Sequence, residues 1–179
     1  MNEPKKRECG SCTMCCKLLN IVDPELTKPA YKWCQHCDIG KGCKIYSTRP
    51  EACKAFECLW LQDRRGVFPD DARPDKSGVV LRPTPVGGVL AHCDKHRPER
   101  WRKLLPRLRR LAMEGYPVGA EAGGRYWVIT GKTEWEAPKE YQIDHGNGFV
   151  DIRIPKDIAM QIGYKVRSTL KLGGPFQPE

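Results

Sequence analysis

Apolar and polar positions follow a regular pattern mainly in the second half of the chain. Two short β-rich runs flank a Pro/Gly turn within 79–92, and another run spans 125–130. Residues 141–154 have the pattern of a hairpin that turns at 145–148. Short runs of this kind, separated by turn residues, are typical of paired antiparallel strands. The sequence therefore predicts a small antiparallel sheet.

One main amphipathic helix is predicted between these strands, at 98–115. Pro98 is suited to its first position and Gly115 to its end. Pro106 lies inside the segment and is expected to kink the helix or to remove a backbone hydrogen bond. A shorter helix is predicted at 156–163. The apolar residues at helical spacing in the main helix are Trp101, Leu104, Leu105, Leu108, Leu111 and Ala112.

The first third of the chain has little apolar periodicity, and its loops separate cysteines. A connector rich in charge, Pro and Gly follows it. The sequence therefore predicts an α+β protein in three parts. These are a loop-rich cysteine-cluster module at 8–62, a polar connector at 63–78 and a small α+β region at 79–170.

The composition is that of a globular protein, and it is rich in cysteine. The 179 residues include 10 cysteines, and the formal net charge is +9. No apolar run has the length of a membrane span, and the first residues are charged rather than apolar. We therefore expect a cytoplasmic protein with no membrane span. Thiols stay mostly reduced in that compartment, so metal or redox chemistry is expected rather than a disulfide framework.

Nine of the cysteines lie between residues 9 and 58. Three of them form C-x-x-C-x-x-C, and a fourth follows directly. Two C-x-x-C pairs favour structural zinc, whereas C-x-x-C-x-x-C with a distant fourth thiol favours a four-iron cluster. Both arrangements fit, so the expected cofactor is zinc or iron, the latter possibly as an iron–sulfur cluster. The candidate ligands are Cys9, Cys12, Cys15, Cys16, Cys34, Cys37, Cys43, Cys53 and Cys58.

The number of candidate ligands exceeds what one tetrahedral site needs. At least two metals, or one polynuclear cluster with leftover thiols, would account for nine cysteines. In an extended backbone the adjacent side chains of Cys15 and Cys16 point apart, which would let them serve different metals or bracket one cluster. Structural zinc contributes about 10–16 kcal/mol, which is enough to hold a loop-rich module folded.

The cysteine pattern resembles that of the YkgJ-type cysteine-cluster family, which is described as zinc- or iron-chelating. The resemblance rests on C-x-x-C-x-x-C-C at residues 9–16 and on C-x-I-Y-x-x-R-P-x-x-C-x-x-F-x-C at residues 43–58. It implies metal chelation by about eight cysteines, one fewer than this chain offers, because both Cys34 and Cys37 are present. A related motif in flagellin lysine methylases accompanies an iron–sulfur cluster. The resemblance therefore also leaves an enzymatic role open.

Several other residues are candidates for supporting roles. Tyr46, Arg49 and Pro50 would either orient the ligands or form a tight turn beneath an aromatic ring. Phe56 and Trp60 are expected to shield the site from water. The histidines and the tenth cysteine are expected mainly to pack or to lie at the surface, although a ligand role is conceivable for each of His36, His92, Cys93 and His96.

Three functions are compatible with these observations. The first is a metal-binding protein without catalysis, since no catalytic residues are recognisable. The second is an iron–sulfur protein with a redox or methylase-like role. The third is a zinc-dependent nucleic-acid binder that uses the arginine-rich segment 98–115, although a solvated helix face explains those charges better. The partner in every case is a metal ion, and no protein partner is indicated.

Overall fold

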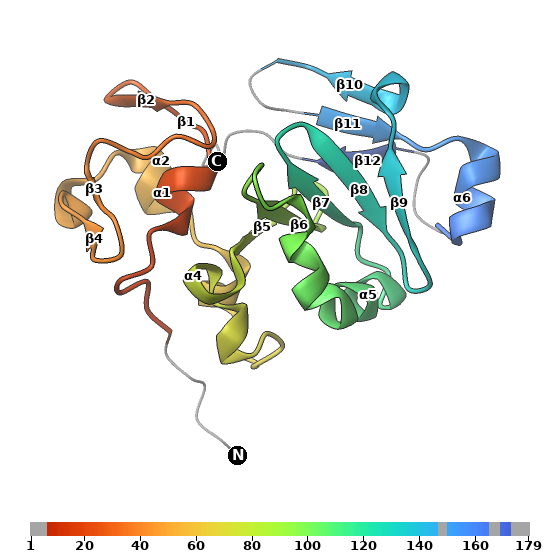
Figure 1. Ribbon diagram of the computed structural model, residues 1–179, viewed down its shortest axis with the longest axis horizontal. Coiled ribbons are helices and arrows are strands. Elements are labelled where there is room, and N and C mark those ends of the chain that lie inside the picture. Colours follow the sequence, from red (N-terminus) through yellow and green to blue (C-terminus); the bar gives the residue numbers. More distant parts are fainter. Residues whose placement is uncertain (1–6, 147–149, 165–168, 173–179) are drawn as a thin grey trace.

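The computed structural model describes residues 7–146, 150–164 and 169–172, with side chains up to residue 164. Figure 1 shows three groups of elements side by side: short N-terminal elements, a central sheet with a helix against it, and a smaller sheet near the C-terminal end. The fold is a mixture of helices and several small sheets, which confirms the α+β class.

The N-terminal region consists of elements of at most five residues. Two two-stranded antiparallel sheets, β1 with β2 and β3 with β4, follow one short helix and precede three more. Such elements bury little surface of their own, so packing and cross-links must hold them. They are α1 (Met14–Leu18), β1 (Ile21–Asp23), β2 (Leu26–Lys28), β3 (Cys37–Asp38), β4 (Gly42–Cys43), η1 (Tyr46–Thr48), α2 (Glu51–Ala55) and α3 (Leu59–Gln62).

The segment predicted as a connector contains two helical turns, η2 (Asp70–Ala72) and α4 (Pro74–Ser77). Phe68 and Ala72 are buried in the same apolar cluster as the central sheet. The guanidinium of Arg7 donates to the carbonyl oxygens of Trp60 and Phe68, at 2.7 and 2.6 Å. The segment is therefore packed against the sheet rather than running free over the surface.

The central sheet has five strands in the order β5-β6-β7-β8-β9. Neighbouring strands are antiparallel except β6 and β7, which are parallel, so the prediction of a wholly antiparallel sheet is wrong at this pair. A parallel pair needs a crossover connection, and the helical segment 98–113 supplies it. The strands are β5 (Val79–Pro83), β6 (Val89–Cys93), β7 (Val118–Ala122), β8 (Arg125–Ile129) and β9 (Glu134–Ala137).

The predicted strands at 79–92 and 125–130 are confirmed as β5, β6 and β8. The pattern did not reveal β7, whose sequence Val-Gly-Ala-Glu-Ala contains a single β-branched residue and otherwise residues that are uncommon in strands. It did not reveal β9 either, in which Trp135 is flanked by two glutamates. Strand pairing with β6 and β8, rather than local propensity, accounts for both elements.

The predicted main helix is divided in two. Residues Pro98–Leu104 form a 3₁₀ segment, η3, and the α-helix α5 covers only Leu105–Met113. Pro106 lies in the first turn of α5, where its missing N–H has no intrahelical role. The proline therefore sets the start of the α-helix instead of kinking a longer one.

A second, three-stranded sheet has the order β10-β11-β12. The predicted hairpin is confirmed, because β10 (Gln142–Asp144) pairs antiparallel with β11 (Val150–Arg153). Part of its predicted turn, at 147–149, lies outside the described residues. The remaining elements are η4 (Lys139–Tyr141), α6 (Lys156–Ile162), which confirms the predicted short helix, and β12 (Thr169–Leu172).

The central sheet has different neighbours on its two faces. On one face, η3 and α5 pack Trp101, Leu104 and Leu108 against the odd-numbered residues of β5 and β6. On the other face, Val80 of β5 contacts Leu18 and Leu19 of the N-terminal region, and residues of the second sheet pack nearby on Leu90 and Val128. The N-terminal region is thus docked directly on the central sheet.

Within the described part of the chain, none of the helices is both long and apolar enough to cross a membrane.

Candidate metal centre

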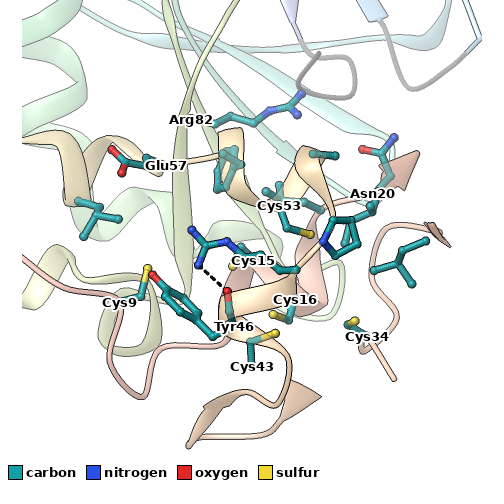
Figure 2. A pocket seen from close by; sticks show the side chains of 18 of the residues that line it. Cys9, Cys15, Cys16, Asn20, Cys34, Cys43, Tyr46, Cys53, Glu57 and Arg82 are labelled. Atoms are coloured by element: carbon teal, nitrogen blue, oxygen red, sulfur yellow. Dashed lines mark hydrogen bonds between the residues drawn. The ribbon is translucent and has the colours of Figure 1, made fainter. Parts of the chain in front are cut away.

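A cavity of about 510 Å³ lies in the N-terminal region and reaches the end of β5. Apolar side chains such as Leu26, Ile45 and Phe56 form part of its wall. Figure 2 shows cysteine side chains contributed by several different elements around it. The cysteines that line the cavity are Cys9, Cys12, Cys15, Cys16, Cys34, Cys43 and Cys53.

Cys15 and Cys16 lie in helix α1, so the expectation of an extended backbone at this pair is wrong. Successive side chains of an α-helix point about 100° apart around its axis, because the helix has 3.6 residues per turn. The two thiols nevertheless contact each other: a hydrogen bond between them raises the pKa of Cys15 and lowers that of Cys16. Cys15 is therefore the proton donor of the pair, and Cys16 is the thiol that ionises more readily.

The loop that follows β2 brings three more cysteines towards Cys16. The amide of Cys34 donates to the carbonyl oxygen of Cys16 at 2.9 Å, and the amide of Cys37 donates to that of Cys34 at 3.0 Å. Cys37 and Cys43 are paired residues on β3 and β4. A hydrogen bond from the Cys37 thiol is a further cause of the low pKa of Cys16. This loop is the local reason why thiols distant in sequence meet.

Three other cysteines form a second neighbourhood. The amide of Cys12 donates to the carbonyl oxygen of Cys9 at 2.9 Å, which closes a tight turn. Burial raises the pKa of Cys58 to about 11, and the charges of Cys9 and Cys12 contribute to the rise. The guanidinium of Arg73 donates to the carbonyl oxygen of Cys9 at 2.9 Å. Cys58, at the start of α3, is therefore close to the first turn of the cysteine motif.

Lys28 is a buried cation beside these thiols. Only 5% of its surface is exposed, and its ammonium donates to the carbonyl oxygens of Pro29 and Lys32 at 2.8 and 2.9 Å. Burial lowers the pKa of Lys28, and neighbouring thiols oppose that shift. A buried ammonium is stable only with hydrogen-bond acceptors and negative charge nearby. The thiols concerned are those of Cys34, Cys16, Cys15 and Cys53.

Residues of the second cysteine block lie at the cavity wall. The Arg49 guanidinium lies 4.0 Å from the centre of the Tyr46 ring, and both residues line the cavity. Pro50 caps helix α2, and its carbonyl oxygen accepts the amide of Cys53 at 2.9 Å. Phe56 also lines the cavity, whereas Trp60 is buried in the apolar cluster beneath the central sheet.

The thiols are not assembled into a finished metal site. Among the described residues, no group of three or more His, Cys, Asp or Glu side chains is arranged so that it could hold one metal ion. The donor set nevertheless suits a soft metal, because thiols from several elements line one cavity beside a buried cation. Ligation would require cysteine side chains to turn about their Cα–Cβ bonds between staggered positions.

The histidines and the tenth cysteine are placed differently from one another. His36 lines the cavity. His92 and Cys93 are buried in β6, where Cys93 belongs to the apolar core and His92 faces Glu121, with 2.9 Å between Nε2 and Oε2. His92 and Cys93 thus have packing partners of their own, away from the residues that line the cavity.

The arginine-rich segment has acidic partners. Arg102 and Arg109 both form ion pairs with Glu134 of β9, and Arg110 pairs with Glu114 at 3.1 Å. These carboxylates neutralise part of the charge that a nucleic-acid surface would need.

Sequence reasoning missed two features of the site. One is the burial of Lys28, because nothing in the sequence around this lysine indicates that it is buried. The other is Tyr31, whose hydroxyl reaches Glu121 of β7. Both depend on contacts between distant segments.

Comparison with known proteins adds no assignment: no family model, no curated protein and no solved structure matches this chain.

Proposed function

We propose that this protein binds zinc or iron through the thiolates of its N-terminal cysteines, as a member of the YkgJ-type cysteine-cluster family. The observation that carries the proposal is the burial of Lys28 among thiols that line a shared cavity. Neutral thiols offer an ammonium little stabilisation, whereas thiolates held by a metal supply the negative charge that it needs.

The proposed role of the metal is structural in the first instance. The N-terminal elements have at most five residues each, and helices and hairpins of that length are marginal in water. A structural zinc held by thiolates contributes about 10–16 kcal/mol, and the ligands would be drawn together from α1, the loop before β3, and α2 and α3.

An iron–sulfur protein with a redox or enzymatic role is the second candidate. The cavity favours it, because its volume of about 510 Å³ falls in the range of small-molecule sites, roughly 300–1,000 Å³. Arg82 and Thr84, at the end of β5 and just beyond it, also line the cavity. A substrate bound there would lie next to the thiols.

The test is metal analysis of the full chain purified without oxygen. We expect zinc or iron in stoichiometric amount; colourless zinc protein supports the structural role. Brown protein with acid-labile sulfide supports the second candidate. Cys93→Ser serves as the matched control, because Cys93 is buried in the core away from the cavity. A reduced chain that retains no metal, and takes up none when zinc or iron is added, contradicts the proposal.

A further inference from the structure

We propose that one face of the crossover segment between β6 and β7 binds the phosphate backbone of double-helical nucleic acid. This surface, called the basic face below, is separate from the thiols, and its binding does not depend on the proposed metal. Its members are Lys76, Arg97, Arg100, Lys103 and Arg107.

The geometry of η3 sorts its side chains onto three faces, because a 3₁₀ helix has three residues per turn. Trp101 is fully buried and lies on the face that packs against the sheet. Glu99 and Arg102 share the second face, where they pair with each other at 2.6 Å. The third face carries Arg100 and Lys103, and Lys103 is exposed.

Helix α5 continues the same division. Residues four apart in an α-helix lie on one face, so Arg107 follows Lys103, and it is exposed as well. Leu108 is buried against the sheet, and Arg109 turns towards β9, where it pairs with Glu134 at 2.7 Å. The segment therefore has paired arginines on the side towards β9 and a separate row of cations on another face.

Two further cations extend this row at its beginning. The side chain of Arg100 runs over Gly78, where an added Cβ atom would lie 3.6 Å from the Arg100 Cδ. Lys76 is exposed on α4, two residues before this glycine, and Arg97 is exposed directly before η3. Figure 1 shows α4 and α5 on the side of the central sheet away from β10 and β11. The second sheet therefore does not cover the basic face.

The charge of the basic face is not neutralised within the described part of the chain. None of its five cations forms an ion pair there. Neighbouring carboxylates have other partners: Asp75 pairs with Arg73, and Glu114 pairs with Arg110, both at 3.1 Å. The five positive charges are therefore available to an external polyanion.

The composition of the basic face favours a nucleic-acid duplex over other anionic partners. Helices that lie on membranes insert an apolar face, whereas the apolar residues of α5 pack on the core. Protein interfaces have an apolar centre depleted of charge, and single-stranded nucleic acid is bound by stacking on aromatic rings. A duplex backbone is bound through charge alone. Because phosphate contacts carry no sequence information, we expect binding that is independent of sequence.

The experiment is a fluorescence anisotropy titration of a short labelled DNA duplex with the full chain at a series of KCl concentrations. Five phosphate contacts predict that log K falls with log[KCl] with a slope of about −4, and that Kd is about 1–100 μM near physiological salt. The double variant Lys103→Ala/Arg107→Ala should bind more weakly, and its slope should be shallower by about 2.

The matched control is Lys139→Ala/Lys156→Ala. It changes the net charge by the same amount, at two exposed lysines of η4 and α6 outside the basic face. The control should bind the duplex as the wild type does. Near-ultraviolet circular dichroism of the packed pair Trp101 and Trp127 shows that each variant is folded.

Three results would overturn the proposal. One is a wild type that does not bind the duplex at low salt, and another is an equal loss of affinity in the two double variants. The third is binding to vesicles that contain phosphatidylserine without binding to the duplex, which would make the basic face a membrane surface. Metal content measured on the same samples keeps the two proposals apart, because a metal-loaded chain that ignores the duplex leaves metal binding intact.

Discussion

The hydroxyl of Tyr31 lies 2.5 Å from both carboxylate oxygens of Glu121, a residue 90 positions further along the chain. Tyr31 has a φ of 65° and is the one non-glycine residue with positive φ in the described part of the chain. Such a conformation costs on the order of 1 kcal/mol or more, so other contacts must offset it. The amide of Tyr31 donates to Leu18 of α1, and its hydroxyl accepts the amide of Gly123 at 2.7 Å. Tyr31 therefore ties the cysteine-bearing helix to the central sheet.

Replacing Tyr31 with phenylalanine should destabilise the docking of the N-terminal region. The variant leaves a buried carboxylate without its hydroxyl donor, and the expected loss in the free energy of unfolding is about 1.5–3 kcal/mol. Chemical denaturation followed by tryptophan fluorescence measures it. Tyr116→Phe is the matched control, because Tyr116 is 47% exposed, and should change stability by less than about 0.5 kcal/mol. Equal losses in the two variants would contradict the role of Tyr31.

The buried carboxyl of Glu121 should make the free energy of unfolding depend on pH. Burial tends to raise the pKa of Glu121, but His92, the amide of Gly124 and Tyr31 hold it below the usual value. Other titratable groups on this sheet face are Arg82 and Tyr126. A carboxyl whose pKa is lower in the folded state stabilises the fold above its unfolded pKa, and this contribution disappears as pH falls through the folded pKa.

The corresponding measurement compares the wild type with Glu121→Gln. The difference in the free energy of unfolding should be largest near neutral pH and should shrink as pH falls below about 4. Loss of metal at acid pH affects both proteins and cancels in the difference. A difference that stays constant, or grows, towards acid pH would contradict the assignment.

Replacing Lys28 with methionine should weaken metal binding. The change removes the buried positive charge beside the thiols of Cys34 and Cys16, and partners of this kind affect metal affinity by about 10–100-fold. Competition with a chromophoric chelator measures the affinity. Lys44→Met is the matched control, since Lys44 is exposed although it follows Cys43 directly. If both variants bind as tightly as the wild type, Lys28 does not balance the charge of the site.

Replacing Cys37 and replacing Cys43 should affect metal binding differently, although the two residues are paired on β3 and β4. The Cys37 thiol contacts Cys16, so Cys37→Ser should lower the amount of bound metal. Cys43→Ser should retain the amount of metal that the wild type binds. Metal analysis of the two purified variants measures both amounts, and the reverse result would make Cys43, and not Cys37, the ligand.

Removal of the metal should loosen the N-terminal region more than the central sheet. Strong chelation is expected to speed amide hydrogen exchange within 8–62, where the elements are short, and to leave β6 and β7 protected. Hydrogen-exchange mass spectrometry resolves the two regions. Uniform loss of protection would show that the whole chain unfolds as one unit, and no loss anywhere would show that the metal is not structural.

Several elements could be predicted from the chain because their signals are local. The two β-rich runs around a Pro/Gly turn within 79–92 predict the strands that the structure pairs as β5 and β6. The hairpin of β10 and β11 and the short helix α6 follow in the same way. Strands β7 and β9 could not be predicted, because pairing with neighbours and not their own composition makes them strands.

The sequence by itself determined which thiols are available and their spacing, and thereby the expectation of metal chemistry. Tertiary structure decided that Cys58 lies near Cys9 and Cys12, that Cys34 and Cys37 lie near Cys16, and that the Lys28 ammonium is buried beside them. The physical reason is that local spacing restricts only turns of a few residues. Contacts across tens of residues depend on how α1 and the loops pack on the sheet, and no short stretch of sequence encodes that packing.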